Sequence, residues 1–188
     1  YEPKEPKYTP SWRPFQLVFF LLNIKSITDP KSKDRNTADL LWFPTGGGKT
    51  EAYLGLIAFT MGHRRLRTDD EIEKYGVTVL MRYTLRLLTI QQFHRASALL
   101  CACELIRKED SDQWGVEPFT IGLWVGMSVT PNDFAESKKA LDTLKSGGNV
   151  YSSSPQQISS CPWCGTSISS RHYIVDDELR RTKIVCPN

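Results

Sequence analysis

The chain reads LLWFPTGGGKT from residue 40 to residue 50, and the fold we predict follows from this stretch. Residues 40–43 are large and apolar, which predicts a short buried strand, and the glycines after them predict a tight loop. From Thr50 to about His63 the residues are apolar on most faces, which predicts a buried helix. A strand that runs through a glycine-rich loop into a helix is typical of a phosphate-binding loop.

The residue types in this loop suit a nucleoside triphosphate. Successive glycines let backbone N–H groups turn toward one anion, because no Cβ obstructs them, and the helix behind the loop adds its positive dipole end. Lys49 would reach the β- and γ-phosphates of ATP, and the Thr50 hydroxyl would bind Mg²⁺. These two are the predicted catalytic residues. The alternative is a glycine-rich turn with an incidental lysine, and Phe43 does stand where the full consensus has glycine.

The rest of the chain alternates in the same way. Residues 77–81 and 120–125 predict two more strands, and residues 15–27, 84–108 and 131–144 predict helices, the last opened by Thr130 and Pro131. Alternating strands and helices predict an α/β fold with a parallel sheet. We assign residues 1–14, with four prolines, to an extended arm and residues 15–148 to the first part of the α/β domain.

Residues 149–188 change in composition to Ser, Pro and Cys and predict a separate zinc-ribbon-like insert. Cys161 and Cys164 have the spacing of a zinc knuckle, and Cys186 resembles the start of a second one. We predict a structural Zn²⁺ bound by these three thiolates, with the fourth ligand beyond Asn188 and His172 as a substitute. The competing interpretation of the C-x-x-C pair is a redox site.

The overall composition says less about function than the motifs do. The 24 Lys and Arg residues against 21 Asp and Glu residues give a net charge of +3, which neither requires nor excludes a nucleic-acid partner. The longest apolar run is too short to span a bilayer, so we expect no membrane partner. Five cysteines fit a reducing, cytoplasmic location better than a disulfide framework. Because the first residue is Tyr1 rather than Met, we expect a partial chain.

Three stretches, residues 12–16, 44–55 and 79–92, resemble the opening motifs of superfamily 2 helicases. Residues 41–54 in particular are similar to the helicase subunit of DISARM anti-phage defence systems and its close relatives. This resemblance implies a RecA-like P-loop domain, of which the chain would hold the first part. It also implies a bacterial, ATP-dependent helicase or translocase that acts on double- or single-stranded DNA, with other defence-complex subunits as partners.

The resemblance also assigns individual residues. It implies that Gln16 contacts the adenine of ATP and that a nucleic-acid backbone is held near Gly126 and by the motif that follows the second predicted strand. Each assignment has an alternative: Gln16 could simply be a glutamine at a helix start, and Gly126 could lie in a plain turn at a strand end. The motif after the second predicted strand could be a solvated helix face. Tyr83 replaces the proline usual in that motif. The complete nucleotide-binding set is Gln16, Thr45, Gly46, Gly47, Gly48, Lys49, Thr50 and Glu51, and the nucleic-acid set is Arg82, Thr84, Arg86, Gln91 and Gly126.

Hydrolysis of ATP also needs an acidic pair for the metal and an arginine finger. Residues 176–178 read Asp-Asp-Glu, but a charged turn explains them better than the acidic motif. We therefore expect this chain alone to be inactive. Two other functions stay open: a nucleotide-gated DNA-binding module with a zinc ribbon, and the motor subunit of a restriction-type nuclease complex.

Overall fold

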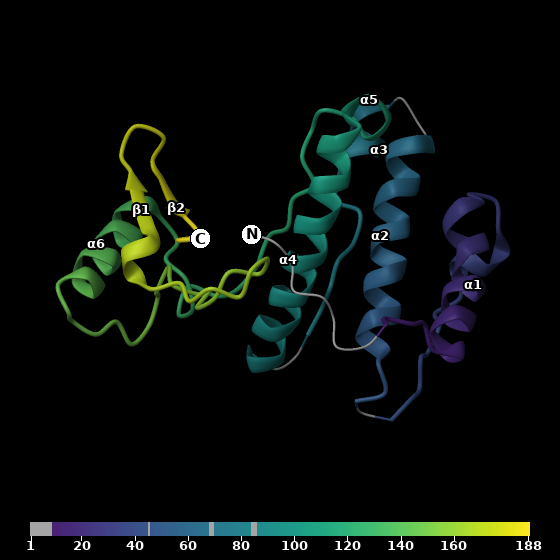
Figure 1. Ribbon diagram of the computed structural model, residues 1–188, viewed down its shortest axis with the longest axis horizontal. Coiled ribbons are helices and arrows are strands. Elements are labelled where there is room, and N and C mark those ends of the chain that lie inside the picture. Colours follow the sequence, from purple (N-terminus) through teal and green to yellow (C-terminus); the bar gives the residue numbers. More distant parts are fainter. Residues whose placement is uncertain (1–8, 45, 68–69, 84–85) are drawn as a thin grey trace. The chain divides into compact units, whose positions relative to one another are not determined.

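A computed structural model describes residues 9–44, 46–67, 70–83 and 86–188. Most regular structure in this part is helical (Figure 1). The helices are α1 (Pro14–Thr28), α2 (Lys49–Arg67), α3 (Glu71–Tyr75), α4 (Arg86–Glu109), α5 (Ser111–Trp114) and α6 (Phe134–Lys145), with short 3-10 helices η1 (Lys33–Asn36) and η2 (Ser170–His172). Two strands, β1 (Tyr173–Asp176) and β2 (Arg181–Ile184), follow.

The predicted α/β fold with a parallel sheet, the RecA-like domain, is wrong for this structure. The sheet of the described residues has two strands, β1 and β2, which pair antiparallel with Tyr173 opposite Ile184. Residues 40–43, 77–81 and 120–125 belong to neither a strand nor a helix. Many of their apolar side chains are exposed to solvent, and Trp124 is 99% exposed. A strand needs a neighbour for its N–H and C=O groups, and these segments have no ladder partner.

The predicted helices are confirmed. Those expected at 15–27, 50–63, 84–108 and 131–144 correspond to α1, α2, α4 and α6. The start of the last helix differs from the prediction, because Asp133, not Thr130, is its N-cap and accepts from Glu136 N at 2.9 Å. Helices could be predicted because each one satisfies its own backbone hydrogen bonds.

Among the described residues, one compact unit comprises 9–82 and 99–119. In it, α1 lies beside α2 (Figure 1), and aromatic pairs join the two helices. The rings of Phe19 and Tyr53 meet edge to face at 5.7 Å, as do those of Phe20 and Phe59 at 5.3 Å. The loop between these helices therefore runs across one end of a packed pair.

The second compact unit includes residues 86–98 and 120–188. Here α6 lies beside the β1–β2 hairpin (Figure 1), and the core is built from Leu141, Cys161, Ile168 and Tyr173. The Tyr173 hydroxyl donates to Ile158 O at 2.9 Å, which connects the hairpin to the segment just before Cys161. The predicted domain boundaries after residues 14 and 148 stay predictions.

Candidate phosphate loop and metal centre

The glycine loop adopts a conformation that only glycine accommodates easily. Gly46 has φ 79° and Gly48 has φ 94°, both in the left-handed region. Gly47 N donates to Pro44 O at 3.1 Å and closes a turn, and α2 begins directly afterwards at Lys49. Predicted residue Thr45 lies outside the described residues.

The Lys49 ammonium lies against the backbone of its own loop. Its Nζ donates to Phe43 O and, at 3.2 Å, to Pro44 O. Thr50 and Glu51 lie in the first turn of α2, where backbone N–H groups have no partner within the helix. The arrangement brings one ammonium group and the positive end of a 19-residue helix to the same loop.

Two residues at the start of α1 hold this loop from the other side. Arg13 Nη1 donates to Gly47 O at 2.8 Å, and Gln16 Nε2 donates to Gly48 O at 2.7 Å. Gln16 is only 4% exposed. The rings of Phe15 and Phe43 stack at 3.9 Å between centroids. The helix α1 and the loop are thus joined by two hydrogen bonds and a ring stack.

The predicted nucleic-acid residues divide between the two units. Arg82 is exposed in the unit that contains the glycine loop, whereas Gln91 is exposed on α4 in the other. Gly126 accepts from Val129 N at 2.8 Å in a turn. Arg86 is the first residue of α4, and Thr84 lies outside the described residues. Their role in binding nucleic acid stays a prediction.

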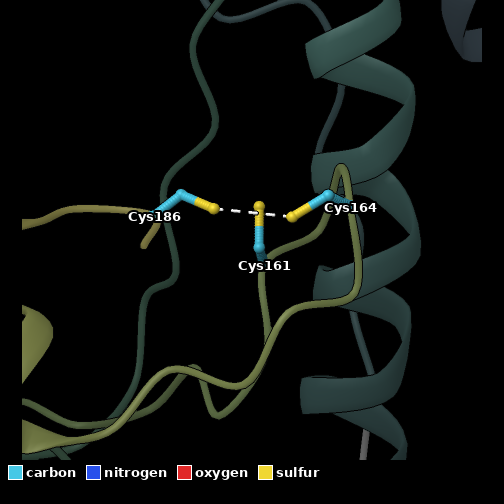
Figure 2. Close-up of side chains that lie close together, drawn as sticks. All are labelled: Cys161, Cys164 and Cys186. Atoms are coloured by element: carbon cyan, nitrogen blue, oxygen red, sulfur yellow. Dashed lines mark hydrogen bonds between the residues drawn. The ribbon is translucent and has the colours of Figure 1, made fainter. Parts of the chain in front are cut away.

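The three predicted cysteine ligands converge on one point. Figure 2 shows Cys161 between Cys164 and Cys186, with all three thiols pointing toward one another. The three sulfur atoms lie within 4.8 Å of one another, and the Sγ atoms of Cys164 and Cys186 are 3.4 Å apart. Zinc–sulfur bonds of about 2.3 Å at tetrahedral angles separate sulfurs by about 3.8 Å. The donor set and its spacing therefore fit a metal such as zinc.

The backbone around Cys161 and Cys164 forms a knuckle. Cys161 N donates to Thr166 O at 2.8 Å, and Gly165 N donates to Cys161 O at 2.9 Å, with Gly165 at φ 74°. Hydrogen bonds with Thr166 lower the pKa of Cys164 to about 6, which favours the thiolate that binds metals. His172 Nδ1 instead accepts from Ser169 N at 2.9 Å, and His172 is not part of the cysteine cluster.

The acidic residues at 176–178 lie at the β1–β2 turn, as the charged-turn interpretation predicted. Asp176 ends β1, accepts from Leu179 N at 2.9 Å and pairs with Lys183 at 2.5 Å. These contacts occupy the carboxylate of Asp176 within the hairpin.

Sequence reasoning missed two residues of these sites. Arg13 contacts the glycine loop across 34 residues of sequence, and its position just before Pro14 and Gln16 was the available signal. His94 Nε2 lies 2.8 Å from the carbonyl oxygen of Ser160, the residue before Cys161. Because His94 and Ser160 are 66 positions apart, no sequence pattern connects α4 with the knuckle.

Comparison with known proteins supports the resemblance to a DISARM protein. The chain is 46% identical over 187 residues to the DISARM protein DrmA of Bacillus paralicheniformis. The match covers 94% of this chain but 16% of that protein, so the chain spans about a sixth of its relative's length. No protein-family model matches the chain, and no solved structure matches it significantly. Within the described residues, no helix is both long and apolar enough to cross a membrane.

Proposed function

We propose, from the premise that this chain is DrmA-like, that it supplies the nucleotide-binding loop of an ATP-dependent DNA helicase or translocase in DISARM anti-phage defence. The observation that carries the proposal is the loop at residues 46–49. Left-handed glycines at Gly46 and Gly48 lead directly into Lys49 at the start of α2. This combination offers backbone amides, a helix dipole and one ammonium group to the same anion.

The chemistry assigned to the loop is the binding of a triphosphate. Lys49 would leave the carbonyls of Phe43 and Pro44 and neutralise charge on the β- and γ-phosphates. The Thr50 hydroxyl, in the first turn of α2, would ligate a magnesium ion, which would screen charge on the same phosphates. The nucleic-acid contacts that we propose, Arg82, Arg86 and Gln91, would bind phosphates of DNA without reading its sequence.

The cysteine cluster has a structural role in this proposal. Cys161 and the hairpin residue Tyr173 share one core, and Cys164 and Cys186 pack against it. A zinc ion held by the three thiolates would therefore connect the knuckle to the end of β2. Other defence-complex subunits are the proposed protein partners.

The test is ATP turnover by the full-length protein with and without DNA. DNA should stimulate hydrolysis by the wild type, and Lys49→Ala should abolish the stimulated rate, because the ammonium that neutralises the γ-phosphate is gone. Lys33→Ala, an exposed lysine on η1, is the matched control and should keep the wild-type rate. Equal rates for wild type and Lys49→Ala would overturn the proposal and favour the DNA-binding module.

A further inference from the structure

Arg13 and Gln16 fix the orientation of two successive peptide groups in the glycine loop. Within one trans peptide, the C=O of a residue and the N–H of the next residue point in opposite directions. Arg13 holds Gly47 O, so the N–H of Gly48 points away from Arg13. Gln16 holds Gly48 O, so the N–H of Lys49 points away from Gln16. Both amides are thereby directed to the side of the loop opposite α1.

The side chain of Gln16 is committed to this task. Its Oε1 accepts from Arg13 N at 2.7 Å, while its Nε2 donates to Gly48 O at 2.7 Å. With 4% of the residue exposed, almost no amide surface remains for a nucleobase. Reading an adenine edge requires both a donor and an acceptor of the same amide to face the base. In this structure both face protein.

Gly48 shows how closely the two elements fit. A Cβ at this position would lie 2.8 Å from Gln16 Nε2, which is too close for a nonbonded contact. The positive φ of Gly48 disfavours a side chain independently of that contact. The approach of Gln16 and the backbone conformation of the loop therefore depend on the same glycine.

We propose that Arg13 and Gln16 are positioning residues that aim the amides of the glycine loop, and that the loop recognises the polyphosphate rather than the base. This inference rests on the proposed nucleotide-binding function and replaces the adenine contact that the resemblance implies for Gln16. Binding through the loop should then be nearly indifferent to the base, with ATP, GTP and inorganic tripolyphosphate as ligands of one class.

The experiment measures the affinity of the full-length protein for ATP, GTP and tripolyphosphate by calorimetry. Gln16→Met keeps the buried volume but removes the donor to Gly48 O, and it should weaken all three ligands by roughly tenfold while the ATP-to-GTP ratio stays at the wild-type value. Arg13→Met should weaken them by about fivefold, and Arg13→Lys, which keeps a cationic donor, should restore most of the loss. Gln113→Met, at an exposed amide on α5, is the control.

Each outcome decides a different point. If Gln16→Met weakens ATP but spares GTP and tripolyphosphate, Gln16 reads adenine and the inference is overturned. Unchanged affinities in both Gln16→Met and Arg13→Met also overturn it. Since Arg13 donates from an exposed position, its variants test the idea even if Gln16→Met does not fold. If Lys49→Ala binds ATP and tripolyphosphate as tightly as the wild type does, the proposed function itself fails, and this inference fails with it.

Discussion

Arg65, on α2, is enclosed by both aromatic rings and carbonyl groups. Its guanidinium lies 4.4 Å from the ring centroids of Tyr75 and Phe119. It donates to the carbonyls of Trp114 at 3.1 Å, Glu117 at 2.8 Å and Pro118 at 3.3 Å. Only 5% of the residue is exposed. One side chain thus connects α2 to the segment after α5.

Replacing this guanidinium should destabilise the fold without touching the glycine loop. We expect Arg65→Met to lower the free energy of unfolding by about 2–4 kcal/mol, because three carbonyls lose their donor and two rings lose a stacked cation. Chemical denaturation gives the measurement. The control is Arg67→Met, two residues along α2, where an exposed ion pair with Glu73 should contribute less than about 1 kcal/mol. Equal losses in the two variants would contradict the prediction.

Glu104 should make stability depend on pH. Hydrogen bonds from Arg107 and from Phe119 N lower the pKa of this carboxyl below its usual value near 4.5, and the Arg107 contacts measure 2.9 Å. Because the folded state binds the proton more weakly, the stabilisation is complete above the unfolded pKa and is lost as pH falls through the folded pKa. We expect the denaturant concentration at the unfolding midpoint to decrease as the pH is lowered below about 4.5. Glu104→Gln should be less stable at neutral pH, by about 1–2 kcal/mol, and should lose this slope; an unchanged slope would point to other carboxyls.

Individual residues were predictable where a short spacing carries the chemistry. The C-x-x-C pair identified Cys161 and Cys164, and the Sγ atoms do converge with that of Cys186. Arg65 and Arg13 were not predictable, because their partners are 49–53 and 34 positions away. A sequence pattern reports what a side chain can donate, but not which carbonyls a distant segment will bring to it.

At the scale of elements, the helices were predictable and the strands were not. An apolar face with a period of 3.6 residues is sufficient for a helix, whose hydrogen bonds are local. The apolar run that contains Trp42 is as strand-like as any in the chain, yet Trp42 is 84% exposed and its segment joins no sheet. The strands that do form are the mainly apolar β1, which reads YIVD, and the mainly polar β2, which reads RTKI, and they pair in an antiparallel hairpin. Pairing partners, not apolar content, decided which segments became strands.

Metal removal should loosen the knuckle and the hairpin together. Cys161 belongs to the same core as Tyr173, and Cys186 follows β2. Loss of the ion therefore removes a link between the knuckle and the end of the hairpin. We expect about one zinc per chain by elemental analysis. Chelation or Cys161→Ser should lower the melting temperature by roughly 5–10 °C, since about 1 kcal/mol corresponds to 2–4 °C at this size.

The control for the metal prediction is a cysteine outside the cluster. Cys103→Ser, on α4, should retain the zinc and nearly the wild-type melting temperature. A protein that contains no metal and whose Cys161 and Cys164 form a disulfide would contradict the prediction. That result would instead support the redox interpretation of the C-x-x-C pair.

At the scale of the whole molecule, the two compact units carry different parts of the proposal. The unit of α1 and α2 holds the glycine loop, and the unit of α6 and the hairpin holds the cysteine cluster. The chain spans 16% of the relative's length, so the proposed activity has to be tested on the full-length protein rather than on this chain alone. Phage resistance in cells depends on nucleotide binding, hydrolysis and DNA binding together, so it tests the whole proposal at once.

Phage resistance should depend on the glycine loop. In a bacterial strain that carries the complete defence system, we expect Lys49→Ala to raise the efficiency of phage plating to that of a strain without the system. The reason is that a motor without its phosphate-binding ammonium cannot couple ATP to movement on DNA. Lys33→Ala, which removes the same charge from an exposed position on η1, should leave resistance intact and controls for net charge and expression. If Lys49→Ala protects as well as the wild type while immunoblots show equal protein levels, defence does not use this loop, and the motor proposal is lost at the scale where it matters to the cell.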